Sequence, residues 1–304
     1  MTICFIHPHK AFLPGVIIYK DFFKGYEGIT IKEVKPQDLH TVTCDVEWHF
    51  MGQQVRRKKE VITIHEYVSA AVPPFSILKD NIKKLINTQP DYRIFGNNYA
   101  LQQYRPKDKI PFGIRDYGIP DNVARLPTEE KKYDFVYVGT VDKSRKIEVL
   151  FDRFASGALK HRTLLVLTRD YGALAGAYAN ATNITFKGPI PNHEVYAHMQ
   201  QARFGINYMP DIIPYNQQTS AKFLDYAACG MPVVTNDYAW VRNFQKQFGG
   251  NYFYLHANLS NFTWDNVNSS RYSLPDLTTW TREKQIRRSG VLEFLESKFT
   301  GIKF

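Results

Sequence analysis

Short apolar runs alternate with helical patterns along most of the chain, and this alternation restricts the fold more than any other feature. Apolar runs recur from residues 3–6 to residues 232–235, and stretches with helical spacing separate several of them. Parallel strands need long crossover connections, which are usually helices, so this order predicts βαβ units and parallel sheets. The sequence therefore predicts the α/β class.

The predicted elements fall into two sets. The first set has strands at 3–6, 29–34, 45–48, 61–64 and 91–95, and helices at 17–23 and 76–87. The second set has strands at 135–138, 164–167, 184–186, 204–208 and 232–235, and helices at 146–154, 195–201 and 222–229, with a last helix over 281–299. A polar run at 126–132 separates the sets. We therefore expect two domains, 1–125 and 126–280, followed by a C-terminal helical segment, 281–304.

Charge and cysteine content limit the class of protein. Lys and Arg total 39 against 29 Asp and Glu, a net charge of +10. Such a balance suggests an anionic partner, namely a nucleotide, a phospholipid surface or nucleic acid, and does not choose among them. The 3 cysteines lie far apart in the sequence, which argues for a reducing compartment and against a disulfide framework or structural zinc. Neither a signal-peptide pattern nor an apolar run of about 20 residues is visible, so we expect a cytoplasmic protein.

Segment 214–235, PYNQQTSAKFLDYAACGMPVVT, combines a polar loop, a helix and a buried strand. The start of a helix presents free backbone N–H groups and the positive end of the helix dipole, which suit a phosphate. Lys222 adds a full charge there, and Asp225, three residues on, shares its face and can accept hydrogen bonds from a sugar diol. An exposed Lys–Asp pair with no ligand is the alternative that this segment alone leaves open.

The same segment resembles the donor-binding segment of GT-B glycosyltransferases, most closely the retaining family 4 type found among bacterial surface-polysaccharide enzymes. Further segments similar to family motifs follow in the family's order: VITIHEY (61–67), DYRIFGNN (91–98), IPFGIRDYGIP (110–120), FVYVGTVDKSRK (135–146) and ITFKGPIPNHEV (184–195). The resemblance implies two doubly wound Rossmann-like domains facing across a cleft. It implies that the first domain binds the acceptor and the second the nucleotide-sugar, with the last helix crossing back to the first domain.

The resemblance implies roles for charged residues of the second domain. Lys146 and Lys222 would neutralise the departing nucleotide diphosphate, an electrostatic role that needs no metal. Asp225 stands where the family usually has Glu, the residue that binds the ribose hydroxyls. Thr140 stands where the family often has Arg, which leaves Arg145 as a substitute.

Further donor contacts follow from the same resemblance. Gly139 ends a strand and allows the backbone to approach phosphate, and the stretch that begins at Gly188 should line the base pocket. Thr219 and Ser220 would give backbone N–H groups to the β-phosphate. Gln217 falls where many members have a Glu that contacts the donor sugar.

Three residues of the first domain complete the predicted site. Gly15 follows the first strand, where the family has a glycine loop under the donor, and an ordinary turn is the alternative. His65 would hydrogen-bond a hydroxyl of the transferring sugar, without acting as a general base. Glu66 is a candidate base only if the reaction inverts the anomeric centre.

Two basic segments of the first domain have two interpretations. One is Arg56, Arg57, Lys58 and Lys59, and the other is Lys79, Lys83 and Lys84 on the predicted helix 76–87. Both fit a solvated surface, and both fit a peripheral contact with anionic lipid.

The expected function is transfer of a hexose-like sugar from a UDP-sugar, or less favourably a GDP-sugar, to a saccharide hydroxyl, with retention and without cofactor or metal. A lipid-linked acceptor in bacterial O-antigen or capsule synthesis is favoured, at the inner face of the plasma membrane. One alternative keeps the fold and glycosylates modified DNA, as phage enzymes do, with the basic domain following the phosphates. Another is a non-catalytic nucleotide-sugar-binding protein, which Gln217 and Thr140 favour.

Overall fold

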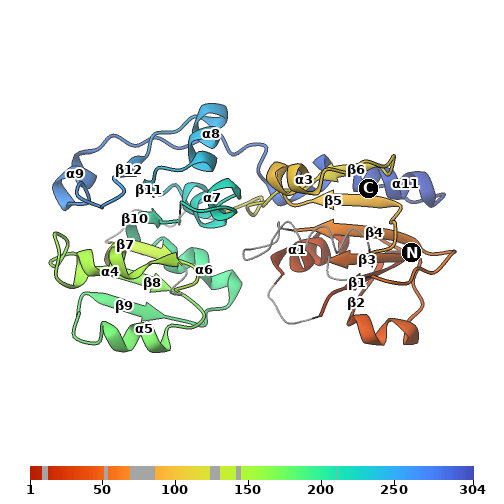
Figure 1. Cartoon of the computed structure of the whole chain (residues 1–304), viewed down its shortest axis with the longest axis horizontal. Coiled ribbons are helices and arrows are strands. Elements are labelled where there is room, and N and C mark those ends of the chain that lie inside the picture. Colours follow the sequence, from red (N-terminus) through yellow and green to blue (C-terminus); the bar gives the residue numbers. More distant parts are fainter. Residues whose placement is uncertain (9–12, 51–53, 69–85, 124–130, 142–144, 210) are drawn as a thin grey trace. The chain divides into compact units, whose positions relative to one another are not determined.

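The computed structural model describes residues 1–8, 13–50, 54–68, 86–123, 131–141, 145–209 and 211–304. The chain divides into two compact units (Figure 1). Unit 1 comprises Met1–Gly118 and Thr279–Phe304, and unit 2 comprises Ile119–Thr278. The predicted boundary at 125/126 lies outside the described residues, as does most of the predicted helix 76–87.

Unit 1 is built on a sheet of six parallel strands in the order β2-β1-β3-β4-β5-β6. The strands are β1 (Thr2–Ile6), β2 (Thr30–Val34), β3 (Val46–Phe50), β4 (Ile62–Tyr67), β5 (Tyr92–Phe95) and β6 (Phe112–Ile114). The helices within the described residues of this unit are α1 (Pro14–Phe23), η1 (Pro36–Thr41), α3 (Asn98–Tyr104), α10 (Arg282–Arg288) and α11 (Val291–Lys298). The short edge strand β6 was not predicted.

The two faces of the unit 1 sheet differ in chemistry. Trp48 of β3 and Ile64 of β4 lie in an apolar core that includes residues of α1, α10 and α11. Successive side chains of a strand point to opposite faces, so Glu47, Thr63 and His65 occupy the other face, and they are buried as well. Unit 1 therefore encloses polar and charged groups that need partners.

The predicted single helix over 281–299 is wrong, because the segment forms two helices, α10 and α11. Gly290 lies between them with φ of 67°, a left-handed conformation that glycine adopts without strain and that ends α10. The turn is packed closely: Tyr92 Oη donates to the Ser289 carbonyl at 2.7 Å. A Cβ on Gly113 of β6 would lie 1.8 Å from that same oxygen.

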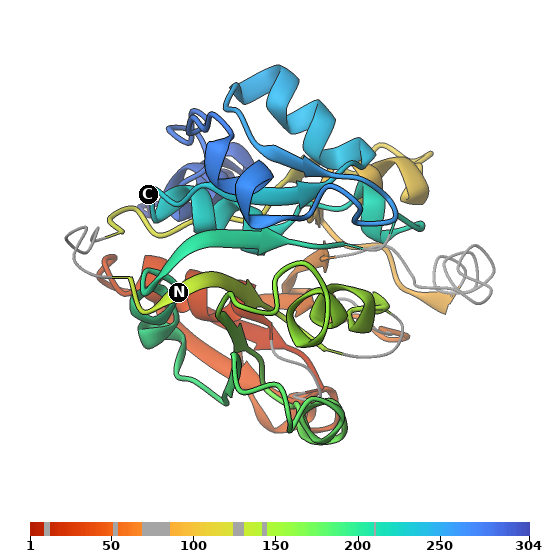
Figure 2. The ribbon, with the colours of Figure 1, turned by 90° about the vertical axis from the view of Figure 1, so that its left-hand side faces the viewer.

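Unit 2 is built on a second sheet of six parallel strands, in the order β12-β11-β10-β7-β8-β9. Its strands are β7 (Tyr133–Val138), β8 (Leu164–Leu167), β9 (Ile184–Lys187), β10 (Ala202–Asn207), β11 (Val233–Asn236) and β12 (Phe253–Leu255). Its helices are α4 (Glu148–Ala155), α5 (Gly172–Ala177), α6 (Asn192–Met199), η3 (Tyr215–Gln217), α7 (Ala221–Ala228), α8 (Ala239–Phe248) and α9 (Trp264–Ser269). In Figure 2, α8 (light blue) lies at one end of this sheet and α5 (green) at the other.

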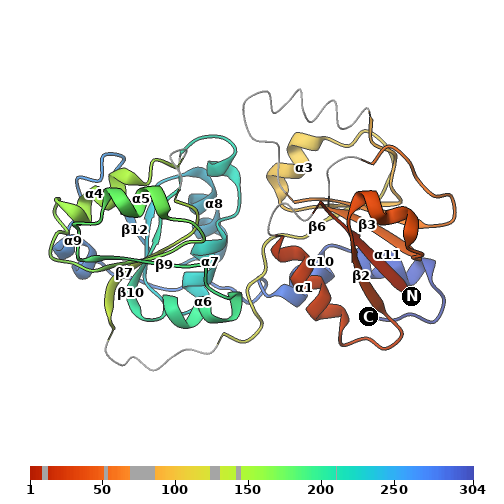
Figure 3. The ribbon, with the colours of Figure 1, turned by 90° about the horizontal axis from the view of Figure 1, so that it is seen from below.

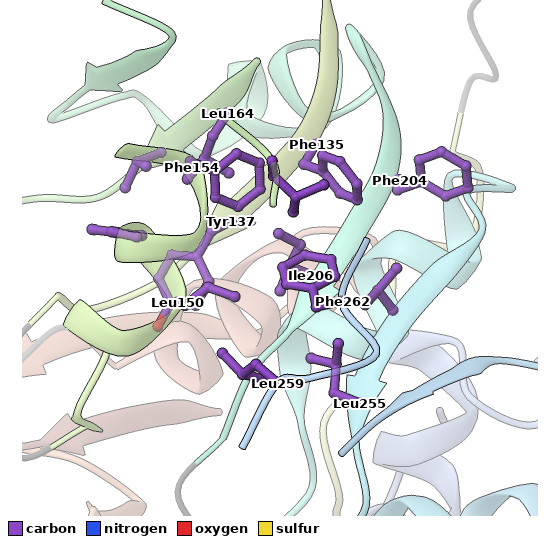
Figure 4. Close-up of a cluster of buried hydrophobic side chains, with 14 of the residues drawn as sticks. Phe135, Tyr137, Leu150, Phe154, Leu164, Phe204, Ile206, Leu255, Leu259 and Phe262 are labelled. Atoms are coloured by element: carbon purple, nitrogen blue, oxygen red, sulfur yellow. The ribbon is translucent and has the colours of Figure 1, made fainter. Parts of the chain in front are cut away.

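Helices cover both faces of the unit 2 sheet. Helices α4, α5 and α9 lie on one face, and α6, α7 and α8 lie on the other (Figure 3). The α4 face is filled by aromatic and aliphatic side chains, among them Phe135, Phe154 and Phe262, which are fully buried (Figure 4). This core therefore accounts for part of the aromatic residues of the sequence.

The strand order of unit 2 reverses between β7 and β10. From β7 the chain continues to β8 and β9 on one side, and it then returns to β10, β11 and β12 on the other. In doubly wound sheets, ligands bind beyond the carboxyl ends of the strands at this switch point. The residues that follow β7 and β10 are therefore the first place to look for a site.

Candidate active site

Lys222 places its amine at the switch point of unit 2. Its Nζ donates to the main-chain oxygen of Tyr208, the residue after β10, at 3.2 Å, and to Tyr137 Oη, on β7, at 3.3 Å. The amine also lies 4.4 Å from the centre of the Tyr137 ring. Tyr137 Oη in turn donates to the Thr140 carbonyl at 3.0 Å. The amine is thus tied to the chain segments that leave both strands.

Among the described residues, no carboxylate balances the charge of Lys222. The residue is 8% exposed, and among the described residues its amine contacts only neutral acceptors. Burial lowers the pKa of the amine well below its usual range, and the positive charge of Arg145 lowers it further. A buried cation without an anion is unfavourable. This point of unit 2 would therefore accept an anion.

The backbone after β7 comes close to the same amine. Gly139 has φ of 138°, and a Cβ at this position would lie 3.5 Å from Lys222 Nζ. Glycine thus leaves the space beside the amine open and adopts the left-handed conformation without strain.

Of the two predicted cations after this turn, the structure brings Arg145 near Lys222. The Arg145 guanidinium lies 5.5 Å from the ring centre of Tyr215 and acts on the pKa of Lys222. Lys146 is exposed and has φ of 49°, a left-handed turn conformation. The helix predicted to begin at Lys146 therefore begins at Glu148. A phosphate contact of Lys146 stays a prediction.

The first turn of α7 has no side-chain cap. Ser220 occupies the N-cap position, but its hydroxyl donates to Asn207 Oδ1 at 2.7 Å. Asn207 in turn donates to Thr235 Oγ1 and Tyr238 Oη, each at 2.9 Å. The Thr219 hydroxyl oxygen is buried and has no hydrogen-bond partner among the described residues. A helix start whose N–H groups lack a side-chain acceptor is suited to an anion.

Tyr226 fixes α7 against the sheet. The side chain is fully buried, and its Oη accepts from Val138 N at 2.9 Å and donates to Ile206 O at 3.3 Å. A Cβ on Gly205 would lie 2.3 Å from the Tyr226 ring, so the ring packs directly on the β10 backbone. The position of Lys222 one turn earlier on α7 is therefore well defined.

Asp225 lies on α7 and is bound from the neighbouring helix α6. Tyr196 Oη donates to Asp225 Oδ1 at 2.5 Å. Lys222 and Asp225 do not form the exposed ion pair that the sequence left open, because the lysine amine is buried against Tyr137 and Tyr208. Sequence reasoning missed Tyr196, since nothing local links it to Asp225.

Two further predicted donor contacts lie in unit 2. Gly188 follows β9 with φ of 154°, and a Cβ there would lie 1.6 Å from the Thr168 carbonyl oxygen, so a side chain would collide with the backbone. Gln217 ends η3, and its side chain makes no hydrogen bond within the described residues. Contacts of both residues with a donor stay predictions.

His65 lies in unit 1 and is fully buried. Its Nε2 contacts Gln54 Oε1, and its Nδ1 lies 3.4 Å from Tyr67 Oη. Burial, assisted by neighbouring positive charge, lowers the pKa of His65 to about 3, so the imidazole is neutral at pH 7. Its predicted contact with the donor sugar stays a prediction.

Glu66 is not available as a general base. The side chain is fully buried, it accepts from Arg115 Nε at 3.0 Å, and its other oxygen accepts from Trp48 Nε1 at 2.9 Å. A base must reach the proton that it removes. Gly15 lies in the first turn of α1 and not in a loop, and a Cβ there would lie 2.7 Å from Arg115 Nη2. Its predicted contact with the donor stays a prediction.

Two residues of the basic segment 56–59 form ion pairs within unit 1. Arg57 Nη2 lies 2.5 Å from Asp91 Oδ2, and Lys58 Nζ lies 3.3 Å from Glu47 Oε1. Arg56 and Lys59 are exposed. The other predicted basic residues, Lys79, Lys83 and Lys84, lie outside the described residues. Within the part of the chain that the structure describes, no helix is long and apolar enough to span a bilayer.

Three comparisons place this geometry among known proteins. A family model described as "Glycosyl transferase-like" matches residues 145–262. A search among curated proteins gives no match. HepE of Anabaena, in complex with UDP and glucose, gives a TM-score of 0.64 at 10% identity, over 98% of this chain and 100% of that chain.

Two more solved structures are similar over the whole length. Sucrose-phosphate synthase of Thermosynechococcus elongatus gives a TM-score of 0.62 at 12% identity, over 98% of this chain and 97% of that chain. An alpha-glucosyltransferase in complex with UDP and a mismatched DNA 13-mer gives 0.60 at 11% identity, over 98% and 99%. The predicted GT-B fold of two Rossmann-like domains is therefore confirmed. The family match lies wholly in unit 2 and includes Lys222 and Asp225.

Proposed function

We propose that this protein is a GT-B glycosyltransferase that binds the diphosphate of a nucleotide-sugar at the switch point of unit 2. The observation that carries the proposal is the buried Lys222 amine, which contacts only neutral acceptors among the described residues. A diphosphate beside this amine, the uncapped start of α7 and Gly139 supplies the missing negative charge. The family model that matches residues 145–262 supports a transferase.

The proposed reaction joins an acceptor oxygen to the anomeric carbon and breaks the bond from that carbon to the phosphate oxygen. The leaving phosphate takes the acceptor's proton, and the sugar keeps its anomeric configuration. Lys222 and Arg145 stabilise the charge that develops on the departing diphosphate, and Asp225 binds the ribose hydroxyls. No metal is required for this charge balance. UDP is the favoured nucleotide, which the UDP in the HepE and alpha-glucosyltransferase structures supports.

The proposed acceptor is a lipid-linked saccharide, reached from the inner face of the plasma membrane. Unit 1 contains 23 Lys and Arg against 15 Asp and Glu, a net charge of +8, whereas unit 2 contains 16 against 14, a net charge of +2. Exposed Arg56 and Lys59 belong to this basic unit. Such a distribution favours an anionic partner for unit 1.

Modified DNA is the second candidate acceptor, since the same excess charge in unit 1 suits a phosphate backbone. The similar fold of the DNA-bound alpha-glucosyltransferase supports keeping this candidate. Binding to anionic vesicles and to duplex DNA, each measured over a range of salt, separates the two. DNA binding with a steep salt dependence and no vesicle binding would favour DNA as acceptor.

Nucleotide release in the presence of UDP- and GDP-sugars tests the activity itself. Lys222→Met should lower turnover about 10–100-fold, because a charge-assisted contact contributes roughly 1.5–3 kcal/mol. The matched control is Lys246→Met, which removes an exposed lysine from α8 and should leave turnover unchanged. Binding without release under any donor and acceptor would indicate a nucleotide-sugar-binding protein, and full activity of Lys222→Met would overturn the site.

A further inference from the structure

Tyr196 and Asp225 link two helices that cover the same face of the unit 2 sheet. Tyr196 lies on α6 and Asp225 on α7 (Figure 3), and the phenol donates to Asp225 Oδ1 at 2.5 Å. A hydrogen bond of this length to an ionised carboxylate belongs to the strong, charge-assisted kind. The contact fixes the orientation of a short acidic side chain one turn from Lys222.

The Tyr196 hydroxyl is not what holds α6 on the sheet. The buried residue of α6 is Met199, and the Tyr196 ring is half-buried. Tyr226 is a contrasting case in the same unit, since its fully buried hydroxyl bonds main-chain groups of β7 and β10. The Tyr196 phenol instead bonds a carboxylate at the proposed site, which indicates a role in orienting that group.

An ionised carboxylate can accept about four hydrogen bonds, so the bond from Tyr196 does not by itself exclude contacts between Asp225 and the two hydroxyls of a ribose. Aspartate is one methylene shorter than the glutamate that is usual in the family that this segment resembles. Fewer of its side-chain conformations can reach a bound ribose. A group locked in its binding orientation loses less conformational entropy when the ligand arrives.

We propose that Tyr196 is a positioning residue that holds the Asp225 carboxylate for the ribose 2′- and 3′-hydroxyls. The pair makes the site select ribonucleotides over 2′-deoxyribonucleotides. The inference rests on the proposed function, because it requires the nucleotide diphosphate to lie beside Lys222.

The test is calorimetric titration with three probes: UDP, 2′-deoxy-UDP and inorganic pyrophosphate. The unaltered protein should bind UDP about 10–100-fold more tightly than 2′-deoxy-UDP, as expected for a hydrogen bond to a charged group. Tyr196→Phe should weaken UDP binding about 3–10-fold and leave 2′-deoxy-UDP and pyrophosphate affinities nearly unchanged. In turnover assays the same variant should raise the donor KM at constant kcat.

A matched control exists on the opposite face of the same sheet. Tyr178 Oη donates to Asp152 Oδ1 at 2.7 Å, so Tyr178→Phe removes an equivalent tyrosine–aspartate bond and should change no nucleotide affinity. Rescue is also expected: Asp225→Glu in the Tyr196→Phe background lengthens the side chain and should restore the preference for UDP.

Each outcome decides the inference. Equal weakening of UDP and 2′-deoxy-UDP by Tyr196→Phe would show a purely structural role, and unchanged UDP binding would show no role. If the unaltered protein binds pyrophosphate and both nucleotides equally, the ribose assignment fails while the phosphate site stands. If it binds none of the three probes, the proposed function fails together with the inference.

Discussion

The two units bury a cation in opposite ways. In unit 1, Arg115 is 6% exposed and donates through Nε and Nη2 to the fully buried Glu66. In unit 2, Lys222 is 8% exposed, and its amine contacts only neutral oxygens among the described residues. A buried charge that pairs with another residue of the chain has a structural role. A buried charge with no counter-ion among the described residues is unfavourable, which indicates that a charged ligand binds there. Both cations are buried, so burial alone does not distinguish the candidate site from the polar interior of unit 1. The difference is whether a counter-ion is present among the described residues.

The largest effect that we expect from this contrast is a loss of stability in unit 1. Arg115→Met leaves the Glu66 carboxylate buried and unpaired, and should lower the free energy of unfolding of unit 1 by about 3–5 kcal/mol. Native-state hydrogen exchange at the amides of β4 and β5 measures unit 1 separately, which a global unfolding curve of a two-unit protein does not. Adding Glu66→Gln should recover much of the loss. A loss below about 1 kcal/mol would show that the Arg115–Glu66 pair contributes little to the stability of unit 1, and it would contradict the contrast with Lys222.

Acid should destabilise unit 1 through His65. The pKa of His65 is about 3 in the folded protein against 6.5 for an ordinary histidine. The unfolded chain therefore takes up a proton below pH 6.5 while the folded protein does not, so stability falls as the pH falls. The contribution should reach about 3 kcal/mol at pH 4. His65→Gln should remove this part of the pH dependence, and an unchanged pH slope in exchange at β4 would contradict the assignment.

Exposed cations of unit 1 should contribute more to binding of anionic vesicles than exposed cations of unit 2. Arg56→Ser with Lys59→Ser removes two exposed cations from unit 1, and Arg203→Ser with Lys246→Ser removes the same two residue types from unit 2. The first pair should weaken binding to vesicles with anionic lipid by about 2 kcal/mol, at about 1 kcal/mol per charge near the surface. The second pair should have little effect. Sedimentation with anionic and zwitterionic vesicles measures both, and equal losses would show no preferred unit.

Much of the fold could be predicted from the sequence because several strands, such as β1 and β8, consist largely of buried apolar residues. β8, Leu164–Leu167, matches its predicted range. The edge strands β6 and β12 are three residues each, too short to show a pattern. The break at Gly290 was missed because it depends on packing with Tyr92 and Gly113, which are distant in sequence.

The candidate site could be predicted only where its residues are local. Ser220, Lys222 and Asp225 share one segment, and a helix start with a lysine is visible in the sequence. The partners of these residues are distant: Tyr137 lies 85 positions from Lys222, and Tyr196 lies 29 positions from Asp225. The burial of Lys222 away from any acid of the described residues also comes from tertiary packing, since the sequence places Asp225 within reach. That imbalance is the main evidence for a ligand, and only the structure provides it.

The smallest expected effect has the opposite sign to that of Arg115→Met. Lys222→Met should leave the ligand-free stability of unit 2 unchanged or raise it by about 1 kcal/mol at pH 7, because it removes a buried charge that has no anionic partner among the described residues. The pKa of Lys222 is lowered in the folded protein, so the unfolded chain binds the extra proton between that pKa and about 10.4.

The stability of the unaltered protein should therefore rise with pH toward that of Lys222→Met, and affinity for pyrophosphate should fall over the same range as the amine loses its proton. Hydrogen exchange at β7 and β10, with and without pyrophosphate, follows both trends. A loss of several kcal/mol in the ligand-free variant would make Lys222 a structural cation like Arg115.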